Sequence, residues 1–110
     1  MKMYLAVLDT VPDFMVPTLV AHAVLGYDMK IHATLTSNPL VLLYYQWREH
    51  SFKKCVVRVN QKEFDKISVL PNVGLNTTLD GKKACAVLVV DDDVPNVLKY
   101  AKLWKPKEVI

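Results

Sequence analysis

The sequence predicts a single three-layer α/β domain over residues 1–110, with a mixed sheet of about four strands and helices on both faces. Short apolar runs of strand length alternate with segments that carry apolar residues at helical spacing. One Asp-Gly pair separates two of these runs and indicates an antiparallel hairpin, whereas strands joined through helices are typically parallel. With 110 residues, the chain is long enough for one hydrophobic core and too short for two.

The first strand and helix form the predicted centre of the fold. Residues 3–8 make a continuous apolar run closed by Asp9, as expected of a central strand that is buried on both faces. After a polar turn, we expect a helix that begins near Met15 and ends at Gly26, because glycine commonly terminates helices. Its core-facing stripe comprises Val16, Leu19, Val20, Ala23 and Val24.

A neighbouring face of this helix carries the first candidate site. Met15, Thr18 and His22 are spaced three and four residues apart, so they project from one side of the helix. Open α/β sheets hold ligands beyond the carboxyl ends of their strands, and these residues follow the first strand closely. We therefore look first for a site here. The alternative for His22 is a structural imidazole bonded to a nearby loop.

The middle of the chain predicts a second helix after an irregular stretch. Residues 27–36 form either a short edge strand or a packed loop. Ser37-Asn38-Pro39 predicts a helix start, because the polar side chains cap free amides and proline suits the first helical position. We expect this helix to run to about Glu49. Its apolar stripe comprises Leu40, Leu43, Tyr44 and Trp47.

Two further strands and a short helix are predicted next. Residues 55–59 are β-branched and short, which favours a strand. Residues 60–63 resemble a capping box and predict a helix that ends before Pro71. A third strand is expected over residues 72–79, entered through Gly74.

The last third of the chain predicts a hairpin and a terminal helix. Asp80-Gly81 indicates a two-residue type I′ turn, and the very apolar residues 84–90 predict a strand in the middle of the sheet. The carboxylates of residues 91–93 suit a hard cation, but we prefer the interpretation that they cap a proline-started helix. The apolar stripe of that helix comprises Val97, Tyr100, Ala101 and Trp104. Its solvent-facing lysines are Lys99, Lys102 and Lys105, and a tail follows.

Composition and charge narrow the class of protein. A hydrophobic content of 52% with three glycines excludes a disordered chain. The net charge of +3, from 14 basic and 11 acidic residues, allows weak attraction to nucleic acid and is also that of an ordinary surface. Cys55 and Cys85 lie in apolar strand-like runs, so we interpret them as buried thiols, not as a disulfide or zinc ligands. With no signal peptide, membrane segment, metal site or cofactor motif, we expect a cytoplasmic protein.

The order of the predicted elements resembles the peptidyl-tRNA hydrolase family of the archaeal and eukaryotic type. Two stretches carry the resemblance. Residues 15–23 resemble the family's first helix, with small residues on both sides of His22. Residues 47–59 are similar to the family's tryptophan, polar turn, paired lysines (here Lys53 and Lys54) and apolar strand. The resemblance implies a small α/β fold with a four-stranded mixed sheet, tRNA as a partner, and hydrolysis of the ester between peptide and tRNA.

The chain departs from the family at positions that matter for chemistry. Met15 stands where the family has a lysine, and Asn72 and Asn76 stand where it has an acid and a hydroxyl. The family's proline-glycine-threonine turn corresponds to residues 80–82, which keep only the glycine. Ester hydrolysis needs a base and an oxyanion donor, roles left here to His22 and the two asparagines. We therefore expect the activity to be strongly reduced or lost.

Two non-catalytic alternatives remain. Basic residues for contact with tRNA are Lys30, Lys53, Lys54, Arg58, Lys82 and Lys83. Tyr27 or Tyr45 would stack on a base, although lysines at loop ends are also ordinary solvated residues. The other alternative is a protein-binding module or homodimer that uses the aromatic residues Tyr44, Tyr45 and Trp47. An exposed Tyr45 would favour it.

Overall fold

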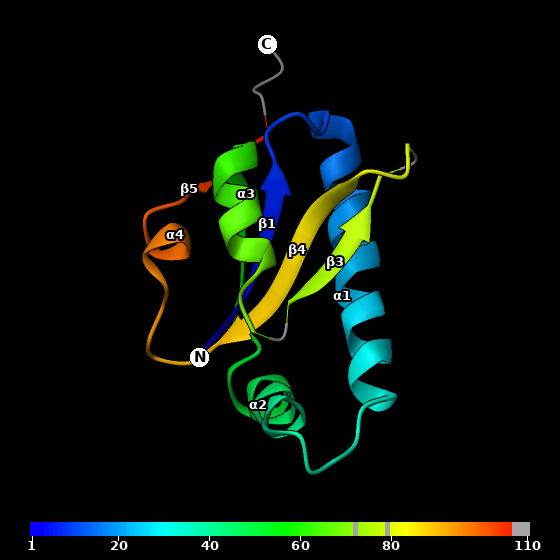
Figure 1. Ribbon diagram of the computed structural model, residues 1–110, viewed down its shortest axis with the longest axis vertical. Coiled ribbons are helices and arrows are strands. Elements are labelled where there is room, and N and C mark those ends of the chain that lie inside the picture. Colours follow the sequence, from blue (N-terminus) through cyan, green and yellow to red (C-terminus); the bar gives the residue numbers. More distant parts are fainter. Residues whose placement is uncertain (72, 79, 107–110) are drawn as a thin grey trace.

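The sheet of this domain is built around its first strand. β1 pairs in parallel with β2 and antiparallel with β4, and the full strand order is β3-β4-β1-β2-β5 (Figure 1). The computed structural model describes residues 1–71, 73–78 and 80–106. The strands are β1 (Lys2–Leu8), β2 (Lys54–Val59), β3 (Gly74–Thr77), β4 (Lys83–Val90) and β5 (Lys102–Leu103). Six of the seven β1 residues and seven of the eight β4 residues are buried, so the two continuous apolar runs are central strands, as predicted.

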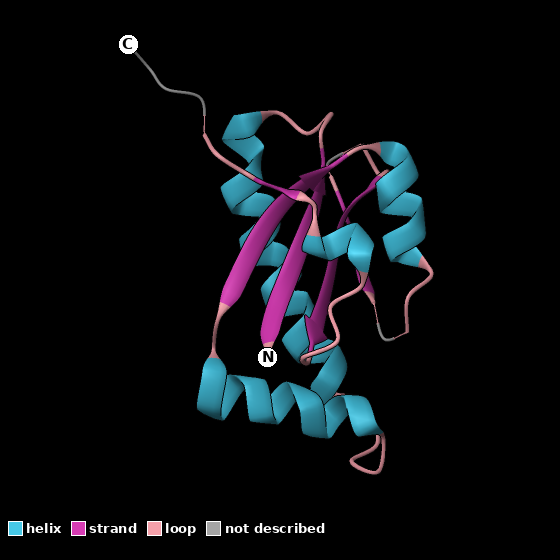
Figure 2. Cartoon of the chain, turned by 90° about the vertical axis from the view of Figure 1, so that its left-hand side faces the viewer, coloured by secondary structure: helices cyan, strands magenta, loops and turns pink. Residues whose placement is uncertain are grey.

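Helices cover both faces of the sheet. They are η1 (Asp13–Met15), α1 (Val16–His32), α2 (Pro39–Gln46), the π turn η2 (Trp47–Ser51), α3 (Gln61–Ser68) and α4 (Asn96–Lys99). α1 packs on β1, β3 and β4 from one side, and α3 with α4 lies on the other (Figures 1 and 2). α2 and η2 close the end of the sheet where β1 begins. The predicted α/β class is therefore confirmed, with five strands where about four were expected.

The prediction that Gly26 ends the first helix is wrong. α1 continues to His32, so most of residues 27–36, expected as an edge strand or packed loop, is helical. Gly26 lies inside the helix where α1 passes β3, and a Cβ at this position would lie 3.3 Å from Oδ1 of Asn76. Tyr27 continues the buried stripe of the helix. This glycine therefore does not terminate the helix but lies within it, where α1 faces β3.

The second helix begins as predicted and ends in an unusual turn. Pro39 is its first residue, and the Asn38 side chain accepts a hydrogen bond of 3.0 Å from the Leu40 amide. Helical conformation continues through the π turn to Ser51, close to the predicted end. Phe52 then adopts a left-handed backbone conformation with φ of 58°, which only a few per cent of non-glycine residues do.

The short third helix confirms the predicted capping box. The Asn60 side chain accepts from the Glu63 amide at 2.8 Å, and the Glu63 carboxylate accepts from the Asn60 amide at 3.0 Å. The helix ends before Pro71, as expected. Because these contacts join residues three apart, the local sequence is sufficient to predict them.

The β3–β4 hairpin forms, but not through the predicted turn. Gly81 has φ of +77°, and its amide donates to the Thr78 carbonyl at 3.1 Å. The Thr78 amide donates to the Lys82 carbonyl at 3.1 Å, so Thr78 and Lys82 close a loop that is one residue longer than the predicted two-residue turn. β3 itself is shorter than the predicted strand over residues 72–79, and the two ends of that prediction lie outside the described residues.

The predicted terminal helix is wrong. α4 has four residues, after which the chain extends and β5 pairs antiparallel with β2. The Trp104 amide donates to the Val56 carbonyl at 2.9 Å. Tyr100, expected on the buried stripe, is 74% exposed. The open edge of β2 offers backbone donors and acceptors, and pairing with them displaces the helix that the side-chain spacing favours.

Candidate functional site

A cleft of about 270 Å³ opens between the start of α1 and the β3–β4 hairpin. Met15, Thr18 and His22, which were predicted to share one side of the first helix, line its α1 side. Thr77 and Thr78, at the end of β3, contribute the facing residues. The structure thus combines the predicted helix face with two hydroxyl side chains that the sequence had not assigned to a site.

A second hollow of about 330 Å³ shares Met15 and Thr78 with this cleft. It is also lined by Thr10, which follows β1, and by Asp80 and Lys82 of the hairpin loop. Lys82 places a positively charged ammonium group near the cleft, whereas Met15 carries no charge. The combined site therefore contains an imidazole, several hydroxyls, a carboxylate and a cation.

An ion pair anchors the turn that precedes α1. Arg58 Nη1 lies 2.8 Å from Asp13 Oδ1, and Arg58 Nη2 donates to the Val11 carbonyl at 2.6 Å. Both charged side chains are about three-quarters buried, with exposures of 23% and 24%. The predicted RNA contact Arg58 thus ties β2 to η1, the turn that ends at Met15.

Asn76, one of the two asparagines predicted as oxyanion donors, does not join His22 in the cleft. Asn76 lies on β3 with its Oδ1 beside Gly26, one helical turn beyond His22, and does not line the cleft. Asn72 lies outside the described residues. Of the two candidate catalytic residues that the structure describes, His22 lines the cleft and Asn76 does not. The adjacent Thr77 and Thr78 take the facing positions.

The six predicted RNA-binding cations do not form one surface. Those at the end of the sheet where β1 finishes are Arg58, Lys82 and Lys83. Those at the opposite end, where β2 begins, are Lys53 and Lys54. Lys30 lies near the end of α1, where its Nζ donates to the Val73 carbonyl at 3.3 Å. Any contact by these residues with one RNA would have to span the length of the sheet.

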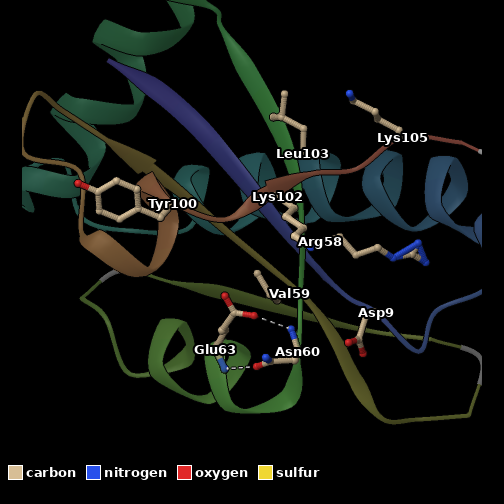
Figure 3. Close-up of a pocket in the computed structure, with 9 residues that line it drawn as sticks. All are labelled: Asp9, Arg58, Val59, Asn60, Glu63, Tyr100, Lys102, Leu103 and Lys105. Carbon is tan, nitrogen blue, oxygen red and sulfur yellow. Dashed lines mark hydrogen bonds between the residues drawn. The ribbon is translucent and has the colours of Figure 1, made fainter.

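A further basic hollow, of about 520 Å³, lies at the carboxyl end of β2. In Figure 3 the C-terminal segment, which pairs with β2 through β5, carries first Tyr100 and then Lys102 and Lys105. Lys102 pairs with Arg58 across the two strands, and Asp9 also lines the hollow. Neither lysine forms an ion pair with a residue that the structure describes. This hollow was not predicted from the sequence, because both lysines were expected on a terminal helix.

A polar network joins α1 to α2. The Tyr44 hydroxyl donates to Asp28 Oδ1 at 2.5 Å, and burial together with this bond raises the pKa of Tyr44. His32 Nε2 lies 3.4 Å from Asp28 Oδ2, and His32 Nδ1 lies 3.1 Å from the Tyr45 hydroxyl. The Arg48 guanidinium lies 4.8 Å from the Tyr45 ring centroid. Tyr45 is therefore half-buried and bonded within the molecule, and is not the exposed aromatic that a protein-binding module would favour.

The carboxylates of residues 91–93 do not cap the helix that follows. All three are exposed, and α4 starts after Pro95 without a side-chain hydrogen bond, so the capping interpretation is wrong. Within residues 1–71, 73–78 and 80–106, no three histidine, cysteine, aspartate or glutamate side chains gather closely enough to hold a metal ion. Cys85 is fully buried, as predicted, whereas Cys55 is only partly so, and both are free thiols.

Comparisons with known proteins leave the family open. No protein-family model matches the chain, and no curated protein matches it. None of the described helices has the length and apolar character needed to cross a membrane.

Proposed function

We propose that the cleft beside α1 binds the ester-linked acyl end of a peptidyl-tRNA and hydrolyses this ester slowly, with His22 as the base. The observation that carries the proposal is that His22 shares one cleft with Met15, Thr18, Thr77 and Thr78, at the end of the edge strand β3. A histidine titrates near neutral pH and is therefore suited to accept a proton from water. The resemblance to the peptidyl-tRNA hydrolase family supports the same substrate class.

The surroundings of His22 give each step of the reaction a candidate group. A neutral imidazole takes a proton from the attacking water as the water oxygen bonds to the acyl carbon, and the imidazolium returns that proton to the tRNA oxygen as the ester bond breaks. The hydroxyls of Thr77 and Thr78, which line the same cleft, are neutral donors for the developing oxyanion. Lys82 in the adjoining hollow is the nearby cation that would stabilise the same charge.

Two features support a slow reaction. No other described residue hydrogen-bonds to His22, so its ring is not held in one orientation. Met15 also supplies no charge where the family has a lysine. Loss of one preorganised electrostatic group typically lowers a rate by about two to three orders of magnitude.

The test is release of an N-acetylated amino acid from tRNA by purified protein. We expect slow release by the wild type, complete loss in His22→Ala, and no change in His50→Ala. His50 is a matched control, because it is an exposed histidine of η2 at the far end of the sheet. Absence of release by the wild type, or release that survives His22→Ala, would refute the proposal.

A second candidate function is RNA binding without catalysis. It is favoured by the hollow in Figure 3, where Lys102 and Lys105 add to Arg58 two cations that lack a described acidic partner. Retention of tRNA on a filter should be weakened by Lys102→Ala with Lys105→Ala. The same substitution at Lys62, on the exposed side of α3, serves as the control and should have little effect.

A further inference from the structure

The outer side of α1 forms a groove with the π turn at the end of α2. The groove has a volume of about 670 Å³ and is among the most apolar surfaces of the molecule. Its α1 wall comprises Pro17, Val20, Ala21, Val24 and Leu25. Its other wall comprises Tyr44, Trp47 and Phe52. A surface helix normally turns polar residues to solvent, yet Leu25 on this side of α1 is 62% exposed.

Phe52 is held at the groove in a costly conformation. Its left-handed backbone typically costs about 1–3 kcal/mol for a residue other than glycine. The Phe52 amide donates to the Trp47 carbonyl at 2.6 Å, and the two rings stack with centroids 5.3 Å apart. The Phe52 side chain nevertheless stays 59% exposed. A rigid, exposed aromatic side chain next to an apolar wall is typical of the anchor residues of protein interfaces.

The dimensions of the groove suit a short helix. Its α1 wall extends from Pro17 to Asp28, which spans roughly 16 Å at 1.5 Å per helical residue. About three turns of a second helix cover that length, with apolar residues at positions i, i+3, i+4 and i+7.

The charged residues at the groove indicate which charge a docked helix should carry beside its apolar face. Lys54 Nζ lies 3.4 Å from the Phe52 ring centroid and donates to the Phe52 carbonyl, but has no carboxylate partner among the described residues. Arg48 and Asp28 line the groove as well, but their charges are already paired, with each other at 3.9 Å and, for Arg48, with Glu49 at 3.1 Å. The lysine is therefore a cation beside an apolar surface, and an acidic residue of a partner would complement it.

We propose that this groove docks an amphipathic helix of a partner protein that carries a carboxylate beside its apolar face, and that the carboxylate pairs with Lys54. The groove lies between α1 and η2 and shares no lining residue with the proposed hydrolytic cleft. The inference is therefore independent of the proposed function.

The test uses two fluorescein-labelled model helices of about 14 residues with the same leucine face. One peptide has glutamates beside the leucines and the other has lysines. Fluorescence anisotropy with the full chain should show saturable binding of the glutamate peptide, about ten-fold tighter than the lysine peptide. Lys54→Glu should reverse this preference. Leu25→Lys should abolish binding, whereas Leu42→Lys should not, because Leu42 is an equally exposed leucine of α2 that does not line the groove.

Three results would overturn the proposal. They are failure of the wild type to bind the glutamate peptide, equal binding of both peptides, and equal loss of binding in Leu25→Lys and Leu42→Lys. Sedimentation velocity on the same samples tests a competing occupant. A wild-type dimer that Leu25→Lys converts to monomer would show that a second copy of the chain fills the groove. Circular dichroism confirms that each variant is folded, so a loss of binding reports on the groove.

Discussion

Substitution of Gly74 by alanine should destabilise the domain, because β3 and α1 leave no room for a methyl group there. A Cβ at position 74 would lie 2.8 Å from Cδ1 of Tyr27 and 3.1 Å from Cγ1 of Val87. Separations below 3.0 Å force neighbouring atoms to move. Tyr27 is 1% exposed and Val87 is fully buried, so neither side chain has open space to move into.

The size of the effect follows from two opposing contributions. Overpacking of a core by one methyl group costs about 1–3 kcal/mol. Alanine restricts the unfolded chain more than glycine does, and this effect raises the free energy of unfolding by roughly 0.4–1 kcal/mol. The net expectation is a loss of about 1–2 kcal/mol in the free energy of unfolding, equivalent to a midpoint lower by roughly 4–10 °C for a domain of this size.

Gly26 provides the matched comparison for Gly74. A Cβ at position 26 would lie 3.3 Å from Oδ1 of Asn76, the far end of a side chain that is able to shift. Alanine inside a helix is favoured over glycine by about 1 kcal/mol, so Gly26→Ala should leave stability unchanged or raise it slightly. Urea unfolding followed by tryptophan fluorescence measures both variants. If Gly74→Ala is as stable as the wild type, or if both variants lose the same free energy, the packing argument is wrong.

Three further predictions concern the ion pair, the buried ionisable groups and RNA. Arg58→Met should lower the free energy of unfolding in urea by about 1–3 kcal/mol, because it leaves the partly buried Asp13 carboxylate unpaired, whereas Lys102→Met on the exposed strand should change little. Burial raises the pKa of Cys85 from 9.0 to about 12 and that of Tyr27 from 10.0 to about 12. The thiol and the phenol therefore ionise at lower pH in the unfolded chain than in the folded one, so the free energy of unfolding should fall as the pH rises from 9 towards 12. In Cys85→Val this fall should begin at a higher pH. A free energy of unfolding that stays constant above pH 9 would contradict the prediction. Binding of tRNA should weaken with salt by a log-log slope of about one per phosphate contact, and tight binding at high salt would exclude an electrostatic mode.

Elements specified by neighbouring residues were the ones that the sequence predicted well. The capping box of Asn60 and Glu63 acts over three residues, and the apolar runs of β1 and β4 need only be buried on both faces. Helix geometry likewise sufficed to place Met15 and His22 on one side of α1, where the structure has them.

The failures arise from contacts between distant parts of the chain. Gly26 has the local signature of a helix end, but α1 continues past it and packs against β3. The segment around Trp104 has helical spacing, but hydrogen bonds to β2 hold it extended. Thr77 and Thr78 were missed for the same reason. They face α1 from a different element, and the periodicity of the sequence does not show which residues of two elements will face each other.

The position of β1 determines when the domain is able to fold. Its parallel partner follows 51 residues later, as Met3 pairs with Lys54, and Val7 pairs with Cys85, 78 residues away. Contacts of such sequence separation close late and make folding slow compared with helical proteins of equal size. During synthesis on the ribosome, the strand at the centre of the sheet therefore lacks one of its two neighbours until β4 has emerged, and chaperones that bind exposed apolar segments have that interval in which to act.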